Sequence, residues 1–102
     1  WMFSLSEMFL TESLKLDPNS PNTLMSLAVA YHLNRDYAKE RPLLEKYLKL
    51  NPSDPQALRL SVQVAGLLKD EALAEKSLEL MREHNPNAVE FAQEFLNSSF
   101  GN

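Results

Sequence analysis

The sequence contains no cysteine, which excludes a disulfide framework, a thiolate zinc site and a cysteine nucleophile. It has only two glycines in 102 residues, and such a low glycine content argues against a loop-rich or β-rich fold and favours uninterrupted helices. No apolar run approaches the ~20 residues that a membrane-spanning helix requires, so we expect no membrane insertion. The chain also lacks an initial methionine and a basic leader, and we expect it to be part of a longer protein.

Basic residues are in the minority. Ten lysines and arginines stand against 14 acidic residues, giving a net charge of −4, so the charge balance gives no reason to expect nucleic-acid binding. The apolar fraction of 44% and the charged fraction of 24% are ordinary for a globular protein. The length predicts one domain at most. We expect a soluble protein, with the cytoplasm favoured over the periplasm.

The prolines recur with a fixed period. Pro18, Pro52 and Pro86 are evenly spaced along the chain, and Pro21 and Pro55 are separated by the same interval, which we call the repeat period. Each pair of prolines ends one helical pattern and starts the next, because proline cannot continue a helix but is favoured at its first position. A period of about 34 residues that holds two helices is typical of stacked helical repeats.

Apolar residues recur at helical spacing between these breaks. The pattern predicts six helices, over residues 3–16, 21–34, 37–50, 55–68, 71–84 and 88–98. Pro42 should kink the third helix, because it removes a hydrogen bond to the carbonyl of Ala38. Phe91 and Phe95 are expected on the inner face of the last helix. The predicted N-caps are Ser20, Asp36, Asp54, Asp70 and Asn87, the last with Glu90 as a capping box.

The apolar and capping residues resemble the signature of the tetratricopeptide repeat family. In one repeat the matching residues are Leu24, Leu27, Ala28, Tyr31, Asp36, Tyr37, Leu44, Leu50 and Pro52. In the next they are Leu58, Asp70, Ala74, Leu78, Leu80 and Pro86. The sequence departs from the family where paired helices cross, because larger residues replace the usual small ones at Glu40, Tyr47, Val62 and Met81.

This resemblance implies an all-α, right-handed superhelix of antiparallel helix pairs. The chain would then be a single domain, with a half-repeat over 1–18, repeats over 21–54 and 55–88, and a C-terminal capping helix over 88–98. It also implies a non-catalytic scaffold or adaptor that binds a peptide or a partner helix in a concave groove. The residues implied to line that groove are Asn22, Met25, Val29, His32, Arg59, Gln63, Glu90, Gln93 and Asn97.

One subtype of the family holds acidic C-terminal tails of chaperones with a lysine and an asparagine. Met25 and Val29 occupy those two positions, so that clamp is absent. Arg59 could meet one carboxylate, although a lone exposed arginine is more often a solvated charge.

A second candidate surface is the apolar N-terminal edge. A dense apolar patch of this kind predicts either self-association into a homo-oligomer or cover by further residues of a longer protein. An oligomerisation module, or a regulatory domain appended to an enzyme, therefore remains an alternative to groove binding. The residues of this edge are Trp1, Phe3, Leu5, Met8 and Phe9.

The sequence shows no arrangement typical of catalysis. His32 and His84 lie at unrelated positions of different repeats, and His32 is expected in the groove or on the surface. There is no phosphate-binding glycine loop, no paired set of metal ligands and no nucleophile with a base at suitable spacing. We therefore expect no enzymatic activity, no cofactor and no metal.

Overall fold

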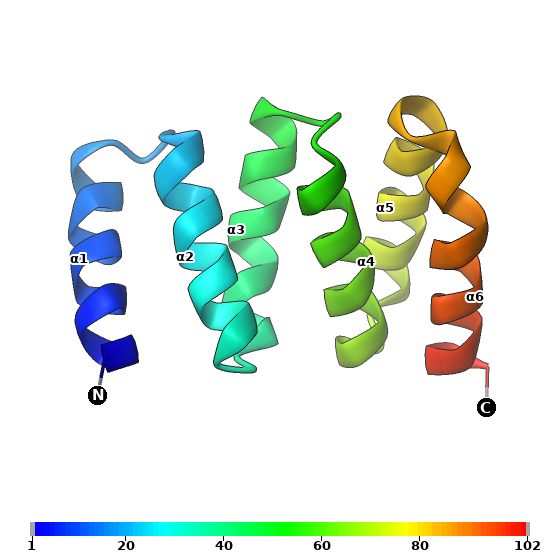
Figure 1. Ribbon diagram of the computed structural model, residues 1–102, viewed down its shortest axis with the longest axis horizontal. Coiled ribbons are helices and arrows are strands. Elements are labelled where there is room, and N and C mark those ends of the chain that lie inside the picture. The colour runs from blue at the N-terminus through cyan, green and yellow to red at the C-terminus, as the bar shows by residue number, and fades with distance from the viewer. Residues whose placement is uncertain (1, 102) are drawn as a thin grey trace. The chain divides into compact units, whose positions relative to one another are not determined.

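The computed structural model describes the backbone from Met2 to Gly101 and the side chains from Leu5 to Gly101. In this part of the chain all regular structure is helical (Figure 1). The chain divides into two compact units, an N-terminal unit up to Leu50 and a C-terminal unit from Asn51. The first holds α1 (Met2–Leu16), α2 (Pro21–Leu33) and α3 (Tyr37–Leu50), and the second holds α4 (Pro55–Leu68), α5 (Glu71–His84), the 3₁₀ turn η1 (Pro86–Ala88) and α6 (Val89–Phe100).

Side-chain caps start three of the helices where the sequence predicts them. Ser20 Oγ accepts a hydrogen bond from the backbone N–H of Thr23 at 3.3 Å. Asp54 Oδ1 accepts from the N–H of Gln56 at 2.9 Å, and Asp70 Oδ1 accepts from the N–H of Leu73 at 3.0 Å. Each bond satisfies a backbone donor that has no partner within its own helix, and α2 and α4 each have a proline at the first position.

The turn inside each unit is a Schellman motif with a non-glycine residue in the left-handed conformation. Arg35 has φ 60° and Lys69 has φ 57°. The N–H of Asp36 donates to the carbonyl of Tyr31 at 2.9 Å, and the N–H of Asp70 donates to that of Ala65 at 2.9 Å. Since these bonds satisfy the last carbonyls of α2 and α4, the same tight reversal recurs one repeat period later.

The last helix begins differently from the prediction. Asn87 lies within η1, and α6 has Ala88 at its N-cap position with no side-chain hydrogen bond. The predicted capping box of Asn87 and Glu90 is therefore wrong, because Pro86 starts a 3₁₀ turn that includes Asn87 and leaves it one residue before the N-cap position of α6. The helix also continues to Phe100 instead of ending at residue 98.

In the N-terminal unit, α2 packs against both α1 and α3. Its predicted apolar stripe of Leu24, Leu27, Ala28 and Tyr31 is buried, and α3 remains continuous through Pro42.

In the C-terminal unit, α4 packs against α5 and also against α6. Gly66 allows the close approach of α6, because a Cβ at this position would lie only 2.5 Å from Cε2 of Phe95 and 2.8 Å from Oγ of Ser99. The buried residues of α6 are Ala92 and Leu96. Phe91 is 78% exposed, so the prediction that it lies on the inner face of this helix is wrong. Phe95 is 36% exposed, and its ring packs on Gly66 of α4 as expected for the inner face.

Candidate functional site

The C-terminal unit contains a pocket of about 560 Å³. Three α-helices and the 3₁₀ turn contribute to it, so it lies entirely within one unit. Its volume falls in the range of sites that bind small molecules. The lining residues are Pro55, Gln56, Arg59, Val62, Gln63, Met81, Asn85, Ala88, Phe91, Ala92 and Phe95.

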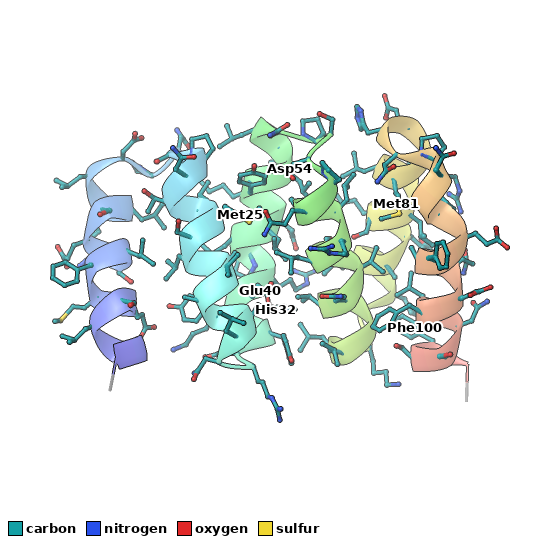
Figure 2. The ribbon with its side chains drawn as sticks, viewed as in Figure 1. Met25, His32, Glu40, Asp54, Met81 and Phe100 are labelled. Carbon is teal, nitrogen blue, oxygen red and sulfur yellow. The ribbon has the colours of Figure 1, made fainter. Side chains whose placement is uncertain are left out.

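Two opposite walls of the pocket come from α4 and α6. Arg59 and Gln63 are one helical turn apart on α4, and Phe91 and Phe95 are one turn apart on α6. Since side chains four residues apart share one face of a helix, each wall carries two neighbouring side chains. Met81 reaches the pocket from α5 (Figure 2). The pocket therefore combines polar groups on one wall with aromatic rings on the other.

Arg59 is the only charged residue that lines the pocket. Among the residues that the structure describes, no ion pair or hydrogen bond engages its side chain, which is exposed. Gln56, Gln63 and Asn85 add neutral donors and acceptors, and no carboxylate of the described residues lines the pocket. The site thus carries a positive charge beside an apolar surface, although the whole chain has a net charge of −4.

The structure separates the groove residues that the family resemblance implies for the C-terminal unit. Arg59 and Gln63 line the pocket, whereas Gln93 and Asn97 lie in a second hollow of about 220 Å³ together with residues of α5. There the Gln93 side chain donates to Asn97 Oδ1 at 3.1 Å. Glu90 is exposed and lines neither hollow.

The reason for this separation is geometric. The family resemblance assigns the same side of the first helix in every repeat to the groove. A pocket between two neighbouring helices, however, is lined by the sides of the helices that face each other. Phe91 and Phe95 therefore face Arg59 and Gln63 across the pocket, and only their aromatic character could have indicated this role from the sequence.

In the N-terminal unit, His32 is engaged by a buried carboxylate. Its Nδ1 lies 2.9 Å from Oε1 and 3.0 Å from Oε2 of Glu40, which is fully buried (Figure 2). Burial raises the pKa of Glu40 to about 7, and the hydrogen bond from His32 opposes that rise. The ring of Tyr37 stands edge-on to His32 with its centre 5.5 Å away. His32 thus joins α2 to α3, in addition to any contact with a ligand.

The other groove candidates of this unit lie on α2. Asn22 is exposed, and Met25 and Val29 are half-buried.

A second polar cluster joins α1 to this helix pair. The hydroxyl of Tyr31 donates to Oε2 of Glu7 at 2.6 Å, and Lys39 Nζ lies 3.8 Å from the same oxygen. Lys39 Nζ also stands 5.7 Å from the centre of the Tyr31 ring. Burial and the bond to Glu7 raise the pKa of Tyr31 to about 12. The cluster therefore fixes one side of α1 on the hairpin.

The opposite side of α1 carries the predicted association edge. Leu5 is 37%, Met8 58% and Phe9 72% exposed. Trp1 and the side chain of Phe3, which the sequence assigns to the same edge, lie outside the described residues.

Within the described residues no three histidine or acidic side chains are grouped closely enough to hold a metal ion. No helix in this same part of the chain has the length and apolar character needed to cross a membrane. No protein-family model matches the chain, and no curated protein or solved structure matches it. The pocket of the C-terminal unit is therefore the candidate site on the strength of its own geometry.

Proposed function

We propose that the chain is a tetratricopeptide-like scaffold that binds a segment of a partner protein in the pocket of its C-terminal unit. The observation that carries this proposal is the pocket itself. It contains Arg59 and Gln63, which the resemblance to the tetratricopeptide repeat family implies to line a ligand groove. A site with polar groups on one wall and aromatic rings on the other suits a peptide, whose backbone needs hydrogen bonds while its side chains need apolar contact.

The local structure supports the repeat interpretation. Ser20 and Asp54 cap helices that begin with a proline, at positions one repeat period apart. Arg35 and Lys69 form the same left-handed turn, again one repeat period apart. Recurrence of both start and stop signals at one period is the behaviour expected of stacked helix pairs.

The proposed ligand segment places one bulky apolar side chain against Met81, Phe91 and Phe95. Gln63 and Asn85 offer amide groups to its backbone, and Arg59 can meet a carbonyl or a carboxylate. We expect most of the binding energy to come from the apolar contact, because aromatic anchors in pockets dominate peptide interfaces. The amides then set the position of the segment.

The test begins with a displayed random-peptide library selected on the wild-type chain. Affinities of selected peptides are then measured for wild type and for an Arg59→Ala, Gln63→Ala double variant. The matched control is a Gln93→Ala, Asn97→Ala double variant, which changes two further predicted groove residues that lie outside the pocket. All three chains are first shown to be equally helical by circular dichroism.

We expect the first variant to lose affinity by about tenfold or more, since removing a hydrogen bond to a charged group costs about 1.5–3 kcal/mol. The control should retain wild-type affinity. Equal losses in both variants, or none in either, would remove the pocket from the proposal.

An assembly module is the second candidate function, and the exposed Met8 and Phe9 of α1 favour it. It predicts that the chain associates in solution and that Phe9→Ser lowers the average molar mass measured by light scattering. A mass that does not change between wild type and this variant would exclude the N-terminal edge as an interface.

A further inference from the structure

The rim of the pocket carries an aromatic side chain that itself lacks cover. Phe91 lines the pocket from α6, yet it is 78% exposed. An exposed phenylalanine next to an apolar hollow is a protruding group beside a space of matching chemistry, and large exposed apolar groups of this kind mark interaction sites.

The charges around Phe91 are opposite to the charge of the pocket. Glu90 directly precedes it and Glu94 follows three residues later, and α6 contains no basic residue. Both carboxylates belong to exposed residues. Arg59 is the only charge that lines the pocket, and no described residue pairs with it. The outer face of α6 therefore has the composition of a ligand for this pocket, an aromatic side chain between two carboxylates.

Because the protruding group and the hollow lie on the same surface, two copies can satisfy each other at once. A two-fold axis that places Phe91 of one copy in the pocket of the other also places Phe91 of the second copy in the pocket of the first. The same operation brings Glu90 or Glu94 of each copy to Arg59 of its partner. Such an interface closes on itself, so it yields a dimer instead of an open chain.

We propose that the pocket of the C-terminal unit receives Phe91 of a second copy of this chain, forming a two-fold dimer through α4 and α6. The proposal rests on the same pocket as the proposed function, but its occupant is different. A dimer of this kind covers the pocket, so a partner segment must displace Phe91 to bind. The stability of the dimer then determines how high the concentration and affinity of a partner segment must be for it to displace Phe91.

The test measures molar mass by sedimentation equilibrium over a concentration series from about 1 μM to about 1 mM, a range that covers weak to moderate dimers. One chain has a mass of 11.6 kDa, and the wild type should approach twice that value. Phe91→Ala should weaken the dimer by about 1000-fold, because it removes an anchor from both copies and each central aromatic anchor contributes about 30-fold or more. Phe9→Ser on α1 is the matched control and should leave the dimer unchanged.

Charge reversal makes the test specific for the pairing of Arg59 with α6. Arg59→Glu alone places like charges at both contacts, and so does a Glu90→Arg, Glu94→Arg double variant alone. Each should be monomeric where the wild type is dimeric. An equimolar mixture of the two should dimerise, because both contacts of the mixed pair again join opposite charges. All the changed side chains are exposed, and circular dichroism checks that each variant remains helical.

A wild-type chain that stays at 11.6 kDa throughout the series would overturn the proposal. Mixed variants that remain monomeric would overturn it as well, and so would a dimer that is lost with Phe9→Ser but kept with Phe91→Ala. A monomer that still binds selected peptides through Arg59 would refute only the dimer and leave the proposed function standing. A dimer whose pocket no peptide enters would support the dimer and refute the proposed function.

Discussion

The stability of the N-terminal unit should depend on pH through a single buried carboxyl group. Glu40 is fully buried between α2 and α3, and His32 Nδ1 is its hydrogen-bond partner at 2.9 Å. Burial raises the pKa of Glu40 from its ordinary value of 4.5 to about 7. The perturbation that isolates this group is Glu40→Gln, which keeps the shape of the side chain and removes its titration.

The sign of the effect follows from proton binding. Between pH 4.5 and about 7 the folded chain keeps the Glu40 proton while the unfolded chain loses it. Stability therefore falls as pH rises through this window. One pKa unit corresponds to about 1.4 kcal/mol, so ionised Glu40 should cost the wild type about 3 kcal/mol by pH 8. Below pH 4.5 both states are protonated and the cost disappears.

The assay is urea unfolding followed by circular dichroism at several values between pH 4 and pH 8, with wild type, Glu40→Gln and the control Glu75→Gln. Glu75 is exposed on α5. The difference in unfolding free energy between Glu40→Gln and wild type should grow by about 3 kcal/mol over this range in favour of the variant, while the control follows the wild type. A constant difference would show that Glu40 ionises as readily in the folded chain as in the unfolded one and would refute this reasoning.

Two further predictions concern the C-terminal unit. Lys69→Gly should stabilise the chain by about 1 kcal/mol, because Lys69 has φ 57° and glycine adopts this left-handed conformation without strain. The same change at Lys76, which lies within a helix, should destabilise the chain by about 1 kcal/mol. Thermal unfolding that gives both changes the same sign would contradict the reasoning from the left-handed conformation of Lys69. Gly66→Ala should gain about 1 kcal/mol from helix propensity in a Phe95→Ala, Ser99→Ala background. It should lose that gain when both side chains are present, because the new Cβ meets the Phe95 ring at 2.5 Å and Ser99 Oγ at 2.8 Å. A double-mutant cycle by denaturant unfolding measures this coupling, and additive effects would show that both side chains move aside freely.

The sequence predicts the helices well because strong local signals define their ends. The expected ranges 37–50, 55–68 and 71–84 match α3, α4 and α5. Proline at the first helical position and an acceptor side chain before it act over a few residues, independently of tertiary packing. At Pro86 the signal is less specific, since the chain forms a 3₁₀ turn before α6 starts.

The close contacts between helices could not be predicted from local signals. The sequence shows that Glu40 replaces a small residue of the resembled family, but the partner of its carboxyl group comes from another helix, and only the assembled hairpin brings His32 to it. Gly66 has an ordinary helical conformation, so nothing in its own neighbourhood in the sequence indicates that Phe95 packs against it. The candidate pocket divides in the same way. The family resemblance implies Arg59 and Gln63, and the opposite wall depends on how α6 packs.

The two units carry side chains of very different size at two equivalent positions of the repeat. His32 and Glu40 stand one repeat period before Gly66 and Ala74. In the N-terminal unit, His32 of α2 and Glu40 of α3 are the larger pair, and their titratable side chains contact each other between the two helices. In the C-terminal unit the corresponding pair is small and buried, and Phe95 of α6 approaches Gly66 directly. Since α6 also supplies Phe91 and the aromatic wall, the pocket depends on a glycine where the other unit has a histidine. The deviations within the repeat therefore give each unit its own chemistry, which is a buried carboxyl group with a raised pKa in one and a candidate binding pocket in the other.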